Sequence, residues 1–337
     1  MPARSLLRTQ ALALSLAGAL AASALIAAAP ASAAAAAADS AEIAWTIETV
    51  DGPHGEGRPN FSYAVDPGTV LTDALRVTNT GRQPLDLAVY AADAYTTPTG
   101  NIDLDTPDLT PDDAGAWVST DTDRLVLQPG EQSEISFTVR VPDGAAPGDH
   151  SAGLITSLLN TQQGTLSVDR RLATRISVRV SGDLVPAVDV SDVVAQYQDS
   201  WNPFAPGILV LDYRLTNTGN TRVTASETLT ASAPAGLFAT TAPVAALPEV
   251  IPGSTIDVHR ELEIAPWGVI SGTVSLSPEA VGLGAQQLDA VVLEFSTPAV
   301  PWAVLVVILV VAALVVLTVL LVRRRARRTA ASSAAAA

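Results

Sequence analysis

Short runs in which apolar and polar residues alternate occupy most of the chain between residues 43 and 297. In 134–141, Ile135, Phe137, Val139 and Val141 fall at every second position, with polar or charged residues between them. A period of two places the apolar side chains on one face of a β-strand, and clusters of Gly, Pro, Asn and Asp separate the runs. Helical spacing is absent from this region, so the pattern predicts an all-β fold of the sandwich type.

The predicted strands form two groups. The first group consists of 43–47, 61–65, 75–79, 85–92, 134–141, 154–159 and 172–180. The second consists of 184–190, 208–216, 224–231, 255–264, 269–276 and 290–295. In 172–180, the alternate residues from Leu172 to Val180 are expected to face the core. Arg260 interrupts the apolar face of 255–264, which predicts an edge strand or a half-buried face. The grouping predicts two tandem Ig-like β-sandwiches at 39–182 and 183–297.

An internal repeat relates the two groups. The hexapeptide RVTNTG at 76–81 returns as RLTNTG at 214–219, and a Pro-Gly pair precedes a strand at 129–130 and again at 252–253. Asn folds its side chain onto nearby backbone, and Gly adopts positive φ without steric cost. We therefore expect an Asn-Thr-Gly turn in each half, with Gly81 and Gly219 at positions that disfavour a side chain.

A continuous apolar segment follows the second group. Residues 299–322 carry no charge, and a helix over 301–322 would be about 33 Å long at ~1.5 Å per residue, enough to cross a bilayer. Trp302 suits the headgroup layer at one end, and five arginines in 323–328 mark the cytoplasmic side. The segment predicts a single-pass membrane protein with a basic cytoplasmic tail at 323–337 and the large N-terminal part outside the cell.

The N-terminus is typical of a signal peptide. Arg4 and Arg8 precede an apolar stretch at 11–29, and residues 31–33 (ASA) offer a small-x-small cleavage site. We interpret 1–38 as a cleaved signal peptide; the alternative is an uncleaved anchor, which would add a second membrane span.

The charge of the outward part excludes several partners. All 34 acidic residues lie between Asp39 and Glu294, whereas seven of the 19 basic residues lie in the two terminal segments. The strongly acidic remainder argues against nucleic acid and anionic phospholipid as main partners. Because the chain has no cysteine, it uses neither disulfides nor thiolate metal ligands.

Several segments of the first group resemble those of the WxL-interacting proteins, a family of bacterial surface proteins. They are 60–63 (NFSY), 66–68 (DPG), 76–81 (RVTNTG), 94–97 (AYTT), 100–102 (GNI), 141–143 (VPD), 147–150 (PGDH) and 153–155 (GLI). The resemblance covers roughly residues 43 to 182 in motif and the whole chain in layout. It implies a signal peptide, an Ig-like peptidoglycan-binding domain, a second Ig-like domain, a membrane span and a basic tail.

The sequence predicts no enzyme, cofactor or dedicated metal site. Asp149, His150 and Ser151 are neighbours whose side chains alternate along an extended chain, so they cannot converge as a catalytic triad. The three histidines are too scattered for a metal signature. Five aspartates in 103–113 form an acidic loop, which is either solvated or a weak structural calcium site.

A row of arginines is the first candidate binding site. Arg171, Arg175 and Arg179 share one face of the strand 172–180 and its start, opposite the apolar positions. Guanidinium groups bind carboxylates and phosphates in a bidentate way, so the row could meet peptidoglycan stem peptides or wall phosphates. The alternative is that the arginines neutralise acidic neighbours on the same sheet and protect an edge.

An aromatic loop is the second candidate. Tyr197, Trp201 and Phe204 fall within 196–207, in a chain with only 4% aromatic residues. They could form a sugar- or protein-binding tip, or they could pack beneath the loop or against the first sandwich.

These observations favour a non-enzymatic, membrane-anchored protein of the bacterial cell surface. Its expected partner is peptidoglycan, another wall polymer or a surface protein, and the membrane is contacted through one helix. The alternative is a structural spacer or an accessory subunit of an exported or membrane complex.

Overall fold

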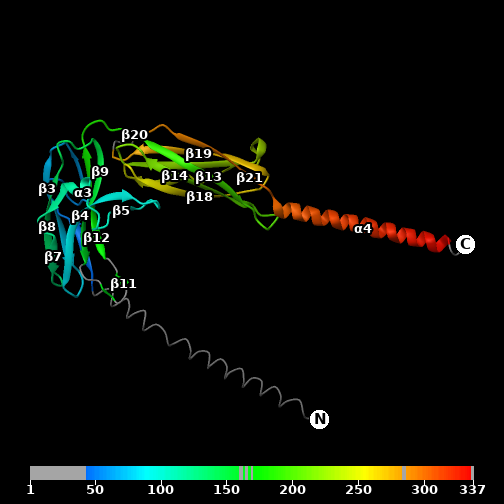
Figure 1. Ribbon diagram of the computed structural model, residues 1–337, viewed down its shortest axis with the longest axis horizontal. Coiled ribbons are helices and arrows are strands. Elements are labelled where there is room, and N and C mark those ends of the chain that lie inside the picture. Colours follow the sequence, from blue (N-terminus) through cyan, green and yellow to red (C-terminus); the bar gives the residue numbers. More distant parts are fainter. Residues whose placement is uncertain (1–42, 159–161, 164–165, 168–169, 283–285, 335–337) are drawn as a thin grey trace, which may run out of the picture.

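The computed structural model describes residues 43–158, 162–163, 166–167, 170–282 and 286–334. The predicted signal peptide lies outside these residues. The described chain is built mostly of β-strands and has one long apolar helix at its C-terminal end, so the predicted all-β class is confirmed (Figure 1).

The N-terminal half contains two main sheets. The first has the order β1-β3-β8-β6, with β1 (Trp45–Thr49), β3 (Val70–Asn79), β8 (Gln132–Arg140) and β6 (Val118–Thr120). The second has the order β2-β12-β9-β4-β5, and β7 also pairs with β4; its strands are β2 (Phe61–Val65), β12 (Arg171–Val180), β9 (Gly148–Leu158), β4 (Leu85–Thr96), β5 (Ile102–Leu104) and β7 (Arg124–Leu127). A short helix, α3 (Ala114–Trp117), and the small pair β10 (Gln162–Gln163) and β11 (Leu166–Ser167) complete this half.

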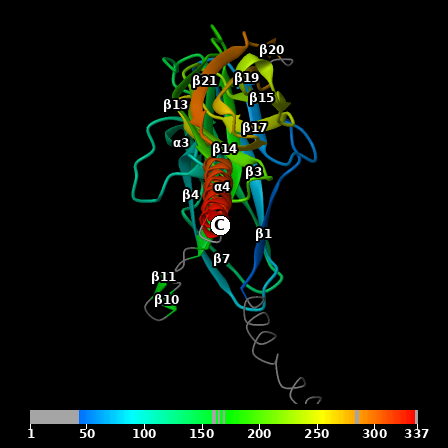
Figure 2. The same ribbon diagram turned by 90° about the vertical axis from the view of Figure 1, so that its right-hand side faces the viewer.

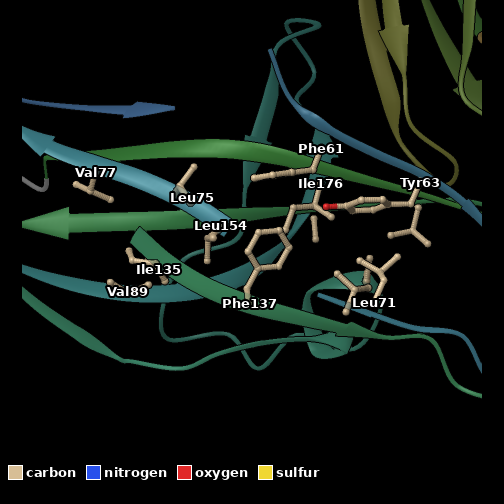
Figure 3. Packing of buried hydrophobic residues seen from close by; sticks show 14 of the residues in the cluster. Phe61, Tyr63, Leu71, Leu75, Val77, Val89, Ile135, Phe137, Leu154 and Ile176 are labelled. Atoms are coloured by element: carbon tan, nitrogen blue, oxygen red, sulfur yellow. The ribbon is translucent and has the colours of Figure 1, made fainter. Parts of the chain in front are cut away.

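The apolar faces of these two sheets enclose the first core. Phe61 and Phe137, which come from opposite sheets, meet edge to face with ring centroids 4.8 Å apart (Figure 3). Leu75 and Ile135 on one side and Leu154 on the other are fully buried between them. The strict alternation of β8 thus produces the buried face that its sequence predicts.

The C-terminal half repeats the two-sheet arrangement around a second core. One sheet has the order β13-β14-β18, with β13 (Val188–Gln198), β14 (Gly207–Asn217) and β18 (Thr255–Ile264). The other contains β16 (Thr240–Thr241), β15 (Val223–Ser232), β19 (Gly268–Ala280), β20 (Gln286–Gln287), β17 (Ala245–Val250) and β21 (Val291–Ala299). A short 3-10 helix, η1 (Pro234–Gly236), follows β15.

The apolar C-terminal segment forms α4 (Trp302–Ala334). Among the described residues, the stretch Trp302–Arg324 is long and apolar enough to cross a membrane, with a mean hydropathy of 3.5 and, from Leu305 onwards, no burial against the rest of the protein. In Figure 1, α4 leaves the end of the C-terminal half that lies away from the N-terminal half, and Figure 2 looks almost along it. The N-terminal half lies across the opposite end.

Most predicted strands are confirmed, although β3 and β9 begin at Val70 and Gly148, earlier than predicted, and the short strands β5, β6 and β7 were not predicted. The predicted strand 184–190 is wrong at its start, because β13 begins at Val188 and continues to Gln198. Leu172 was expected to face the core but is exposed, since its position near the start of β12 lies beyond the core. The sequence reading also missed β17, whose alternation is weak and interrupted by Pro248. Of the two alternatives that Arg260 indicates, an edge strand or a half-buried face, the structure shows an edge strand, because β18 is the last strand of its sheet.

The internal repeat corresponds to the same hydrogen-bonded arrangement around a buried asparagine in each half. Asn79 and Asn217, both fully buried, each donate from Nδ2 to two backbone carbonyls and accept from a glycine N–H through Oδ1, at 2.7–3.1 Å. Their own carbonyls accept from the glycine of the Pro-Gly turn, Gly130 at 2.9 Å and Gly253 at 3.0 Å. In both halves, the Asn-Thr-Gly motif is therefore hydrogen-bonded to the Pro-Gly turn.

The expected role of the hexapeptide glycines is partly wrong. Gly81 and Gly219 do not adopt positive φ; instead Gly130 and Gly253, in the Pro-Gly turns, do so at +78°. Gly219 is required for another reason, because a Cβ there would lie 2.4 Å from the backbone nitrogen of Ala187. Its N–H donates to the Ala187 carbonyl, and the N–H of Gly81 donates likewise to the Ala44 carbonyl.

We expect Asn79→Ala and Asn217→Ala to lower the free energy of unfolding by about 2–3 kcal/mol each, because each leaves buried backbone groups without a hydrogen bond. Denaturant unfolding of the full chain in detergent micelles would measure the loss. Asn101→Ala is the control, since Asn101 is exposed in a loop. Equal stability of all three variants would contradict the proposed role of the buried asparagines.

Candidate functional site

The arginine row lies on the outer face of β12, as predicted. Ile176, Val178 and Val180 face the core, and the arginines occupy the alternate positions. All three are engaged in ion pairs: Arg171 with Asp103 at 3.3 Å, Arg175 with Glu249 at 3.0 Å and Arg179 with Asp149 at 2.6 Å. Asp103 and Asp149 belong to the same sheet as the row, which matches the alternative interpretation that the arginines neutralise neighbouring carboxylates.

Two of these arginines also connect the halves of the molecule. Glu249 lies in β17 of the C-terminal half, and Arg179 donates to the backbone carbonyls of Val281 and Gly282 at 2.7 and 2.8 Å. The row therefore does not stand free as one patch, because the C-terminal half covers Arg175 and Arg179.

Asp149 is the centre of this junction. Its carboxylate is almost fully buried and accepts two hydrogen bonds of 2.6 Å from Arg179 and one of 2.8 Å from the backbone N–H of Arg222. The Arg222 guanidinium, also buried, lies 3.6 Å from Asp149 and 3.1 Å from Glu249. We call Asp149, Arg175, Arg179, Arg222 and Glu249 the Asp149 cluster, in which charges of opposite sign alternate.

Backbone contacts surround the Asp149 cluster. The N–H of Asp149 donates to the Asn220 carbonyl at 2.7 Å, and the N–H of Asp257 donates to the Pro98 carbonyl at 2.8 Å. Thr96, at the end of β4, accepts from the Ile251 N–H through its hydroxyl and donates its own N–H to Ser254. These bonds join the halves at several separate points and so fix their relative orientation.

Sequence reasoning missed Asp149, Arg222 and Glu249 as members of this cluster. The register that places Arg179 opposite Asp149 across β12 and β9 could have linked one pair. The partners in the C-terminal half had no comparable signal, because the contact joins segments about 70 to 100 residues apart.

The structure separates the three residues of the aromatic loop. Tyr197 lies in β13 rather than in a loop and packs against the second core, where its hydroxyl donates to the Ile264 carbonyl and accepts from the Gly207 N–H. The predicted loop position of Tyr197 is therefore wrong, because β13 continues to Gln198. Trp201 and Phe204 stand out into solvent with 89% and 94% of their surface exposed, so they do not pack beneath the loop.

The acidic loop is held by a buried carboxylate. Asp93 in β4 accepts hydrogen bonds from the backbone N–H groups of Asp112, Asp113 and Gly115 at 2.8, 3.1 and 2.5 Å. These hydrogen bonds attach the C-terminal end of the acidic loop to β4. No group of three or more carboxylates and histidines in the described part of the chain is arranged to hold a metal ion.

His150 and Asp149 point to different partners and form no catalytic relay with Ser151. The His150 Nδ1 lies 2.6 Å from Asp113 and Nε2 lies 2.9 Å from the Ala146 carbonyl, and the ring packs 4.6 Å from that of Trp117. Burial lowers the pKa of His150, but the hydrogen bonds to Asp113 and Ala146 outweigh burial, so the pKa lies above its usual value.

This shift predicts a pH-dependent contribution to stability. A histidine whose folded pKa exceeds its unfolded value of about 6.5 stabilises fully below that value and loses its effect as pH rises through the folded pKa. We expect the stability difference between wild type and His150→Gln to be largest near pH ~6 and to shrink towards pH ~8. Thermal unfolding across this range tests it. His259→Gln is the control because that exposed pair with Asp212 is screened by solvent. A difference that grows with pH would contradict the assignment.

Comparison with known proteins finds no matching family model and no matching curated protein. Solved structures show a distant likeness. The class 5 fimbriae chaperone CfaA is 10% identical, with 76% of this chain and 100% of that chain covered and a TM-score of 0.34. The E. coli chaperone DraB is 12% identical over 75% and 99%, with a TM-score of 0.32. The Pseudomonas aeruginosa CupB2 chaperone is 12% identical over 72% and 99%, with a TM-score of 0.31. Similarity at this level does not assign the chain to that group.

Proposed function

We propose that this protein is a non-enzymatic, membrane-anchored protein of the bacterial cell surface. In this proposal α4 spans the membrane, the two halves are tandem Ig-like domains outside the cell, and the N-terminal one binds a wall polymer or a surface protein. The observation that carries the proposal is the position of α4, which leaves one end of the C-terminal half while the N-terminal half lies across the other (Figure 1).

The strand β19 supports this arrangement. It begins at Gly268, opposite Ala299 and close to the start of α4, and ends at Ala280, just before the carbonyls that accept from Arg179. Thirteen residues at ~3.3 Å each make the strand about 40 Å long. The C-terminal half would hold the N-terminal half at about that distance from the membrane.

The charge distribution supports the orientation. The arginines that follow the apolar part of α4 favour a cytoplasmic C-terminus, and the acidic remainder suits an outward, soluble part. The resemblance of residues 43–182 to peptidoglycan-binding domains supports a wall polymer as the ligand of the N-terminal half.

Co-sedimentation with purified peptidoglycan sacculi tests the binding role. We expect the full chain in detergent micelles to sediment with sacculi, and sacculi stripped of their phosphate-bearing polymers would tell peptidoglycan from those polymers. In a control without sacculi, the protein should remain in the supernatant. If the chain binds neither preparation, wall binding is wrong.

A second candidate function is a structural spacer for another exported or membrane component. The Asp149 cluster favours it, because the arginines best suited to an anionic ligand already pair with carboxylates and two of them hold the halves together. In that role the fixed orientation of the halves is itself the function.

A further inference from the structure

Four segments meet at the end of the C-terminal half from which α4 leaves, and we call them the aromatic tip: 199–206, 233–239, 265–267 and 300–302. The strand register places them together. Gly207 at the start of β14 lies opposite Ile264 at the end of β18, and Gly268 lies opposite Ala299. Phe238 and Trp267 join two of the segments by stacking, with ring centroids 5.5 Å apart.

The aromatic tip exposes large apolar side chains. Trp201 and Phe204 are almost entirely exposed, and Phe238, Trp267 and Trp302 each expose more than half of their surface. Scattered apolar residues are common on protein surfaces, but a gathering of this kind marks an interaction surface. Three of the five tryptophans of the chain belong to it.

The aromatic tip is almost free of charge, in contrast to the rest of the outward part. Asp199 is the single ionisable residue in its four segments. The Asp199 carboxylate accepts a hydrogen bond of 2.8 Å from the backbone N–H of Trp302, at the start of α4, where a helix leaves its first amides unpaired. The one charge present is thus used to hold α4.

The junction with α4 fixes the aromatic tip relative to that helix. Ala299 is buried in the second core, only Val300 and Pro301 separate it from α4, and Ala303 in the first turn is buried again. If α4 crosses the membrane from Trp302 onwards, the aromatic tip has to lie at the membrane surface and cannot swing away from it.

The segments are also built to present their side chains rigidly. Prolines occur in all four of them, and Ala235 and Phe238 hold positive φ angles of 61° and 53°. Positive φ is strained for residues other than glycine, and such strain concentrates at functional positions. Rigid loops lose little conformational freedom when they insert into another phase.

We propose that the aromatic tip inserts into the headgroup layer of the membrane that α4 crosses, so that the C-terminal half is seated on the lipid rather than tethered above it. Tryptophan and other amphipathic aromatic rings prefer this layer, and an uncharged surface enters it without the cost of removing ions from water. The occupant is the lipid interface itself, and the inference rests on the proposed anchoring by α4.

Site-specific labels in the full chain test this inference, because the chain has no native cysteine. Three single variants carry a polar fluorophore: Ala205→Cys in the aromatic tip, Val306→Cys within α4 and Val126→Cys on β7 of the N-terminal half. The protein is reconstituted into phosphatidylcholine nanodiscs that contain nitroxide lipids. We expect strong quenching at 205 by nitroxides near the headgroup and at 306 by nitroxides deep in the chains, and none at 126.

A matched pair of variants assigns the effect to the aromatic side chains. Trp201→Ser and Phe204→Ser together should bring quenching at 205 close to the level at 126, while quenching at 306 stays unchanged. Because both side chains are exposed, the melting temperature should also stay unchanged. Quenching at 306 without quenching at 205, or quenching at 205 that survives the double substitution, overturns the insertion and leaves the anchoring intact. Absence of quenching at 306 overturns both.

Discussion

Replacing Asp149 with alanine is expected to lower the free energy of unfolding by about 3–5 kcal/mol, because it leaves the buried guanidinium of Arg222 and that of Arg179 without their shared carboxylate. Both arginines are largely covered by protein, and Arg179 has no second carboxylate within ion-pair distance in the described chain. Denaturant unfolding of the full chain in detergent micelles measures the loss. The same variant should loosen the contact between the halves, which small-angle scattering would detect as a broader distribution of distances.

Asp192→Ala is the matched control for this prediction. Asp192 also pairs with an arginine, Arg214, at 2.8 Å, but both side chains are more than half exposed. Exposed pairs contribute little, so we expect a change within about 0.5 kcal/mol. If Asp149→Ala behaves like this control, the Asp149 cluster does not hold the two halves together.

Replacing Arg260 with methionine is expected to cost a similar amount, about 3–5 kcal/mol, because it strands the carboxylate of Glu227 inside the second core. Glu227 is fully buried on β15, and Arg260 reaches it from the facing sheet at 3.1 Å. The remaining partner is the Tyr213 hydroxyl at 3.0 Å. Burial, together with the Glu227 carboxylate, raises the pKa of Tyr213, so this tyrosine keeps its proton and donates a hydrogen bond, but it supplies no positive charge in place of Arg260. Denaturant unfolding measures the cost.

The double variant Arg260→Met, Glu227→Leu separates the lost pair from lost packing. Removing both charges takes away the stranded carboxylate, and apolar replacements of buried ion pairs are often neutral or stabilising. We therefore expect the double variant to regain most of the stability. A double variant as unstable as Arg260→Met would show that packing around these side chains, rather than the unpaired charge, determines the effect.

The strands could be predicted wherever one face is buried, because burial imposes the period of two. The strand 255–264 was predicted with the bounds of β18, and Arg260 was recognised as an interruption. Its partner Glu227 was not recognised, because the ion pair joins two different sheets. The alternation within one strand does not indicate which residues lie opposite it in the facing sheet. The repeat around Asn79 and Asn217 could be predicted because the same short motifs recur in both halves of the sequence. The hydrogen bonds that join these motifs, such as the bond from the Gly130 N–H to the Asn79 carbonyl, link segments far apart in the sequence and could not be predicted.

The candidate sites were harder to predict because their meaning depends on how distant segments pack. The arginine row was placed on the right face, but only the contact between the halves reveals that Glu249 and the Val281 carbonyl cover it. Tyr197 and Trp201 lie close in sequence and differ in role because the former still belongs to β13. Their separation follows from where a strand ends, the least certain feature of an alternating pattern.

The path of the chain through the C-terminal half determines how that half would respond to mechanical tension. The chain enters β13 at Val188, near the N-terminal half, and leaves β21 at Ala299, beside α4. If the protein links the wall to the membrane as proposed, a pull between the two acts along β21, whose nine register pairs with β19 run from Val291 to Ala299. Such a load shears all of these pairs at once instead of opening them one after another like a zipper. The C-terminal half is thus arranged to resist being pulled apart along its own axis.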